Sequence, residues 1–256
     1  MGIEKRLRFV ISAIVMSFLF LISTFFFFDK AVIFIPLLAV AAYICTFFAV
    51  FEGIEKNEWF MLFILPVLLT VASYLFYFLF PVRWLTRIPF VLVYGVSIYA
   101  VLLSSNIFNV GVERNLQLYR AGFSVNYFLQ TIAFFLFSNV IVSFHWGFLA
   151  NAFIFAALAF ILSLQLYWSI RLDLHISREV FHYALLTMLA VGEVGILLSL
   201  MPIQTSIFAL TVSVAYYCTA GLAHLYIDER LFKHSLREYI IILAVIGTIV
   251  LLSLAW

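Results

Sequence analysis

Nine long apolar stretches, joined by short polar connections, constrain this chain more than any other feature. A membrane-spanning helix needs about 20 consecutive apolar residues, and backbone that faces lipid must be hydrogen-bonded inside a helix or a closed barrel. Barrel strands are about half as long and alternate in polarity, whereas these stretches are continuously apolar. The sequence therefore predicts an all-α, polytopic transmembrane helical bundle. Its spans are Phe9–Phe28, Ala31–Phe51, Trp59–Phe80, Ile88–Asn109, Phe123–Phe144, Gly147–Trp168, Val180–Met201, Gln204–Tyr226 and Tyr239–Trp256.

Composition excludes a water-soluble fold. The 256 residues are 67% hydrophobic and 10% charged, against about 25% charged in soluble domains. The first apolar stretch is longer than the roughly 7–15 residues of a signal-peptide core, so we interpret it as a retained span. Asp29-Lys30 is predicted to form a tight hairpin between the first two spans. No connection is long enough for a soluble domain, and residues 1–256 are predicted to form one transmembrane domain.

The distribution of basic residues predicts the orientation. Of the fourteen Lys and Arg residues, only Lys30, Arg83 and Arg87 lie on the side opposite the N-terminus. Because cytoplasmic loops are enriched in Lys and Arg, the N-terminus is predicted to be cytoplasmic and the C-terminus outside. This topology accounts for the net charge of +2 without a nucleic-acid partner.

Glu193 is the one charged residue deep in a predicted span. It lies in Gly192-Glu193-Val194-Gly195, and an acid at such depth costs at least about 2.5–3.5 kcal/mol. No Lys or Arg shares its depth, so we expect a neutral carboxyl. Two interpretations stay open. Glu193 belongs to a proton, ion or substrate site, or it bonds to Asn139, Tyr216 or Tyr217 and locks helix packing. The glycines permit close approach of a helix or a ligand.

Alanines recur along the sixth predicted span. Small residues allow transmembrane helices to approach closely, so this span is predicted to be a close-packed central helix. The alanines are Ala150, Ala152, Ala156, Ala157 and Ala159.

A polar cluster is predicted at the cytoplasmic ends of the seventh and eighth spans. His175, Glu179 and His182 share one helical face if the seventh helix begins early, and His224 and Asp228 are four residues apart. Glu-x-x-His is the spacing of di-iron bundles, but the additional carboxylates of such sites are missing. A proton relay, a divalent-metal site or ordinary polar contacts fit the pattern. We predict no metal and no cofactor.

The connection around residues 110–122 is the most polar part of the chain, and it contains Glu113, Arg114 and Arg120. Its helical spacing fits a short amphipathic helix at the cytoplasmic interface, which would bind lipid headgroups or a partner. The same residues fit an ordinary connector that carries the arginines of a cytoplasmic loop.

Three stretches carry a resemblance to a known family: Asn106–Gly122, Ile176–Pro202 and Asp228–Ile240. Together they resemble a family of multi-pass membrane proteins of unknown function from candidate-phyla bacteria. The resemblance implies a location in the bacterial cytoplasmic membrane. It implies no activity and assigns no role to any residue.

Motifs of familiar enzymes are absent from the sequence, which argues against an enzyme. The first functional interpretation is a non-catalytic membrane subunit or scaffold of a larger assembly, whose partners are the lipid bilayer and other membrane protein subunits. The second is a small secondary transporter or channel subunit that uses Glu193. The third is a lipid-modifying enzyme that acts through His182 and His224 at the cytoplasmic mouth.

Reporters fused to the two termini test the topology. An odd number of spans places the termini on opposite sides, and the charge distribution places the N-terminus inside. We expect a cytoplasmic reporter to be active only at the N-terminus and an exported reporter only at the C-terminus. Two termini that report from the same compartment would contradict the nine-span assignment.

Overall fold

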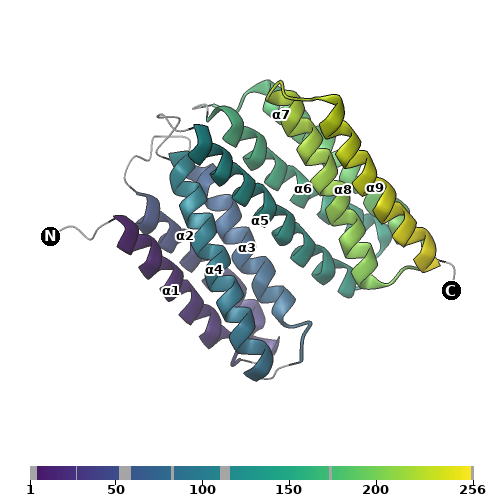
Figure 1. Ribbon diagram of the computed structural model, residues 1–256. Coiled ribbons are helices and arrows are strands. Elements are labelled where there is room, and N and C mark those ends of the chain that lie inside the picture. Colours follow the sequence, from purple (N-terminus) through teal and green to yellow (C-terminus); the bar gives the residue numbers. More distant parts are fainter. Residues whose placement is uncertain are drawn as a thin grey trace. The chain divides into compact units, whose positions relative to one another are not determined.

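The computed structural model describes residues 5–26, 28–51, 59–81, 84–109, 116–172 and 175–254. Within these ranges the chain forms nine α-helices and no strand (Figure 1). Each helix is long and apolar enough to cross a membrane, so the predicted all-α polytopic class is confirmed. The helices are α1 Lys5–Ser23, α2 Phe28–Val50, α3 Trp59–Tyr77, α4 Trp84–Asn109, α5 Leu116–Ser143, α6 Phe148–Arg171, α7 Arg178–Ser199, α8 Thr205–Ile227 and α9 Lys233–Leu254.

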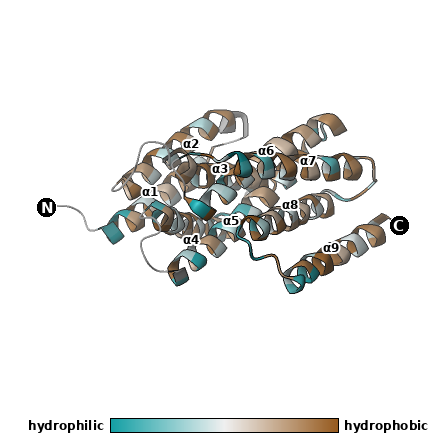
Figure 2. Cartoon of the chain, turned by 90° about the horizontal axis from the view of Figure 1, so that it is seen from above, coloured by the Kyte–Doolittle hydropathy of each residue, from teal (hydrophilic) through white to brown (hydrophobic). Residues whose placement is uncertain are grey.

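Every predicted span corresponds to one helix, but several helix ends differ. The predicted hairpin at Asp29-Lys30 is wrong, because both residues belong to α2. The chain turns earlier because α1 ends earlier: the Ser23 hydroxyl donates to the Phe20 carbonyl at 2.7 Å, and the Thr24 hydroxyl donates to the Leu21 carbonyl at 2.6 Å. Figure 2 shows helices coloured mostly hydrophobic, with hydrophilic residues gathered toward ends such as the start of α9.

The helices group into two compact units, Met1–Ala133 (unit 1) and Phe134–Trp256 (unit 2). The division falls inside α5, so that helix contributes residues to both units. The two units are defined by where contacts are dense, which does not show whether each unit folds independently. The single domain over residues 1–256 therefore stays a prediction.

Aromatic side chains form the centre of unit 1. Phe20 of α1 stacks on Tyr94 of α4 at a ring separation of 4.4 Å and meets Tyr74 of α3 edge-on at 6.0 Å. The Tyr94 hydroxyl is 2.9 Å from the Thr70 hydroxyl of α3. Such rings bury a large apolar area in defined relative orientations, and they join α1, α3 and α4 around one core.

Polar side chains of unit 1 bond to the backbone of neighbouring helices. The Ser12 hydroxyl of α1 donates to the Cys45 carbonyl of α2 at 3.1 Å. The Asn109 amide of α4 donates to the Val50 carbonyl at the end of α2 at 2.8 Å. Buried polar groups need partners of this kind because lipid offers none, and the two bonds join α1 and α4 to α2.

Close packing of small residues joins α6 to α7 in unit 2. A Cβ atom added at Gly192 would lie 3.2 Å from the Cβ of Ala156, and one added at Gly195 would lie 3.0 Å from the Cδ2 of Phe155. Ala152 is buried on the same side of α6. The alanine pattern of the sixth span therefore marks a close-packed helix, as predicted, and its neighbour across the glycines is α7.

A hydrogen bond and two aromatic contacts complete the core of unit 2. The Tyr167 hydroxyl of α6 is 2.6 Å from the Thr187 hydroxyl of α7, and both residues are fully buried. The Phe134 ring of α5 stacks on Tyr216 of α8 at 4.6 Å with almost parallel planes. By contrast α9 packs mainly on α8 and buries only Ile246 and Val250, so it is peripheral in this unit.

Substitution of the glycines tests the α6–α7 contact. Gly192→Val and Gly195→Val force side-chain atoms against Ala156 and Phe155, and overpacking of this kind costs about 1–3 kcal/mol. Both variants are expected to melt at a lower temperature in detergent. Gly247→Val on α9 is the control, because no neighbouring atom lies within 4 Å of an added Cβ. Equal melting temperatures for all three variants would contradict the packing.

Candidate functional sites of unit 2

Glu193 lies on the surface of α7, although glycines that pack against α6 flank it. Apart from Arg178 and Phe181 near its start, the exposed residues of α7 and its C-cap recur every three or four positions, which places them on one face of the helix. We call this face the α7 stripe. Its members are His182, Leu186, Leu189, Glu193, Leu197 and Leu200. Each of the four leucines is more than half exposed. Beyond His182 at its start, the stripe is thus an apolar surface with one carboxyl group on it.

The structure does not bring the predicted partners to Glu193. The Asn139 amide donates to the Phe135 carbonyl of its own helix at 2.8 Å, Tyr216 stacks on Phe134, and the Tyr217 ring lies 5.6 Å from that of Tyr239. Among the residues that the structure describes, the Glu193 side chain makes no hydrogen bond and no ion pair.

A second feature is a cleft of about 480 Å³ at the other end of α7, toward the side that is predicted to be cytoplasmic. Three helix ends form it: the end of α6, the start of α7 and the end of α8. The volume falls within the range of about 300–1,000 Å³ that is usual for small-molecule sites. Its lining residues are Arg171, Glu179, Tyr226, Ile227, Glu229 and Leu231.

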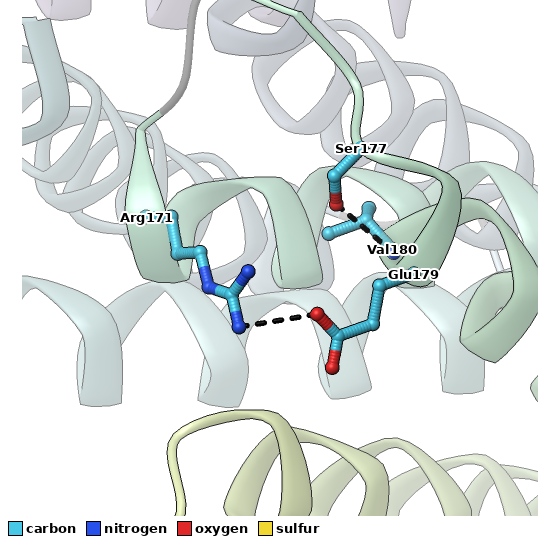
Figure 3. Close-up of polar contacts among 4 residues, drawn as sticks. All are labelled: Arg171, Ser177, Glu179 and Val180. Atoms are coloured by element: carbon cyan, nitrogen blue, oxygen red, sulfur yellow. Dashed lines mark hydrogen bonds and ion pairs between the residues drawn. The ribbon is translucent and has the colours of Figure 1, made fainter.

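An ion pair forms one wall of the cleft. The Arg171 Nη2 atom lies 3.1 Å from Glu179 Oε2, and Figure 3 shows the two side chains pointing toward each other. Ser177 caps α7 by accepting a hydrogen bond from the Val180 N–H at 3.3 Å. Arg171 is in the last turn of α6 and Glu179 in the first turn of α7, where each charge complements its helix dipole. Both side chains are more than two-fifths exposed, so the pair adds at most about 1 kcal/mol to stability.

Glu229, which also lines the cleft, has a backbone conformation that is unusual for its side chain. Its φ is 55°, in the left-handed region that favours glycine. The Glu229 N–H donates to the Tyr226 carbonyl at 3.1 Å, and the Arg230 N–H donates to the Leu225 carbonyl at 2.8 Å. This is the Schellman arrangement, in which glycine or asparagine usually follows the helix. Neighbouring Asp228 pairs with Arg230 at 3.2 Å.

The predicted polar cluster is divided by the structure. Because Ser177 caps α7 and the helix begins at Arg178, it does not begin early, and His175 lies before it and does not share a helical face with Glu179 and His182. His182 is exposed on the α7 stripe, and His224 is half-buried in α8. Within the described ranges, no three His, Cys, Asp or Glu side chains are grouped so that they could hold a metal ion.

The predicted interfacial loop is only partly described. Glu113 and Arg114 lie outside the described residues, whereas Arg120 is exposed in the second turn of α5. From Leu116 onward the polar stretch is therefore the start of α5 and not a separate amphipathic helix. A role for Glu229 was not predicted from the sequence. One feature of the sequence could have indicated it: the eighth span ends in Asp228-Glu229-Arg230 and lacks the glycine that commonly ends a helix.

Comparison of the chain with protein-family models, with curated proteins and with solved structures finds no match.

Replacement of Glu229 tests the strain at the end of α8. A left-handed backbone costs an ordinary L-residue about 1–2 kcal/mol, and glycine avoids that cost. Glu229→Gly is therefore expected to raise the melting temperature of the detergent-solubilised protein. Glu238→Gly, in the interior of α9, is expected to lower it, since glycine costs about 0.5–1 kcal/mol inside a helix. A decrease for Glu229→Gly would show that other interactions of Glu229 outweigh its strain.

Proposed function

We propose that this protein is a non-catalytic subunit or scaffold of a larger membrane assembly, and that its α7 stripe binds a transmembrane helix of another protein. The observation that carries the proposal is the exposed Glu193 carboxyl, which has no partner among the described residues. In the proposed arrangement the chain lies in the bacterial cytoplasmic membrane with its N-terminus inside, as the charge distribution and the family resemblance predict.

The depth of Glu193 makes its exposure costly. The residue lies six positions before the end of the 22-residue helix α7, which is about 7 Å from the helix midpoint at 1.5 Å per residue. That position is well inside a hydrocarbon layer of about 30 Å. Acids at such depth almost always pair with another group or face the interior of a bundle. A partner helix would supply the missing contact.

Charge complementarity identifies the chemistry of that partner. A Lys or Arg at matching depth on the partner helix would neutralise the carboxylate, and intramembrane charges commonly pair in this way. The leucines on both sides of Glu193 would pack against apolar residues of the same helix, since packing contacts drive helix association in lipid. A second copy of this chain is less suitable, because two facing stripes would bring two acids together.

The position of the cleft favours this proposal over transport through Glu193. A coupling carboxyl needs access to water, and the cleft that the described residues form at this helix is lined by Glu179 and not by Glu193. Glu179 and Glu193 are fourteen residues apart on α7, which corresponds to about 21 Å. The surroundings of Glu193 on the stripe are apolar, and they suit a helix better than a hydrated ion.

A designed peptide tests the proposed contact. A transmembrane peptide of Leu and Ala with one central Lys, and a matched peptide with Leu at that position, are reconstituted with the full-length protein in lipid vesicles. Energy transfer between labels on peptide and protein measures association. The Lys peptide is expected to bind about tenfold more tightly, because intramembrane polar contacts contribute about 1–2 kcal/mol and about 1.4 kcal/mol is a factor of ten.

Two variants serve as matched controls in this experiment. Glu193→Leu is expected to abolish the preference for the Lys peptide, whereas Leu251→Ala, on an exposed part of α9, is expected to preserve it. Equal binding of both peptides would refute the proposal. Self-association of the chain that depends on Glu193 would replace the partner by a second copy, and ion flux in vesicles that Glu193→Gln abolishes would favour a transporter.

A further inference from the structure

We infer that the cleft of unit 2 binds a phosphoethanolamine group, with the ammonium at Glu229 and the phosphate at Arg171. This inference does not depend on the α7 stripe, because the cleft is formed at the start of α7 and shares no residue with the stripe. The argument rests on the charges that the three helix ends place around the cleft.

Glu229 provides the position for a cation. Among the described residues its carboxylate makes no ion pair, and it follows the end of α8, where the helix dipole is negative. Carboxylate and dipole therefore repel each other until a cation binds. A primary ammonium donates three hydrogen bonds and would satisfy Glu229 together with other acceptors at this end of the cleft.

Arg171 provides the position for an anion. Its Nη2 atom faces Glu179 at 3.1 Å, and a guanidinium carries five N–H donors, so donors remain for a second oxyanion. The planar guanidinium matches the geometry of phosphate oxygens. Glu179 acts as a positioning residue, because its carboxylate orients Arg171 in the wall of the cleft without contacting the ligand.

The whole set of charges selects a zwitterion with an ammonium and a phosphate. Arg171, Glu179 and Glu229 together carry one net negative charge, so a purely anionic ligand is disfavoured. A simple cation would satisfy Glu229 and leave the remaining donors of Arg171 unused. A trimethylated ammonium cannot donate hydrogen bonds to Glu229, and a glycerol group lacks the positive charge. These differences predict selectivity among headgroups of similar size.

The location of the cleft points to a lipid as one source of this group. The cleft lies at the ends of three spans, where the headgroup layer of a bilayer begins. Tyr226 is more than half exposed there, as is usual for aromatic residues at the membrane boundary, and Leu231 adds apolar surface. A free phosphoethanolamine from the aqueous side carries the same ammonium and a phosphate with one additional ionisable oxygen, and it is the other source.

Binding of an ammonium group explains why a glutamate stands at position 229. Glycine or asparagine would fit the left-handed conformation better, and a carboxylate at the end of α8 is unfavourable for the helix dipole. Local stability thus disfavours Glu229 on two grounds, and strained residues of this kind gather at ligand sites. A bound ammonium compensates for the unfavourable charge.

Native mass spectrometry of the full-length, delipidated protein tests the inference. Phosphatidylethanolamine and phosphatidylcholine with identical acyl chains are titrated, and soluble phosphoethanolamine is added as competitor. Phosphatidylethanolamine is expected to bind at least tenfold more tightly than phosphatidylcholine. Displacement by the soluble compound would show that the headgroup suffices for binding, and tight lipid binding without displacement would identify the lipid as the source. Either result supports the assignment.

Variants distinguish the cleft from general lipid binding. Glu229→Asn, which keeps a residue suited to the left-handed conformation, and Arg171→Gln are each expected to reduce the preference for phosphatidylethanolamine about tenfold. Glu238→Gln is the matched control, because it removes an exposed carboxylate that pairs with His234 on α9 and lies outside the cleft. Equal affinity for the two lipids, or a preference that survives both cleft variants, would overturn the inference.

Discussion

The hydrogen-bonding requirement of the backbone in lipid underlies every other feature of this protein. Water is absent from the hydrocarbon layer, so each apolar stretch must pair its own N–H and C=O groups as a helix. This leaves unpaired polar groups mainly at helix ends and on side chains. Many hydroxyl groups within the spans follow this division and bond to carbonyls of their own helix or of a neighbour, as Thr70 does to Pro66 and Ser12 to Cys45.

Packing between α6 and α7 decides what Glu193 can do. Gly192 and Gly195 place the α7 backbone against Ala156 and Phe155, and this fixes the rotation of α7 about its axis. The side chain between the two glycines then lies on the outer face, among exposed leucines. A rotation of α7 that buried Glu193 would bring larger side chains to the contact with α6. The exposed acid is therefore a consequence of tight packing, and it leaves unit 2 with one carboxyl group among exposed leucines.

The cleft reflects the need of polar groups for partners, here at the helix ends. Arg171 and Glu179 lie where the dipoles of α6 and α7 favour their charges, and they pair across the short connection between those helices. Glu229 lies where both the backbone conformation and the dipole of α8 are unfavourable for it. One ion pair and one acid without an ion-pair partner among the described residues give the cleft its mixed charge. The α7 stripe and the cleft use different residues of one helix, so the partner proposed at Glu193 and the headgroup proposed at the start of α7 occupy separate sites.

The sequence by itself determined the fold class, the number of spans and their approximate limits, because apolar length and the absence of charge depend on residue type alone. It also identified α6 as a close-packed helix and Glu193 as the exceptional acid. Tertiary structure decided which way Glu193 points, since that depends on how α7 rotates against α6. It placed His175 before α7, because the Ser177 cap fixes where the helix begins. It also brought Arg171, Glu179 and Glu229 around one cleft. Arg171 and Glu229 are 58 positions apart in the sequence and line the same cleft through the packing of helix ends, and no local pattern in the sequence encodes this arrangement.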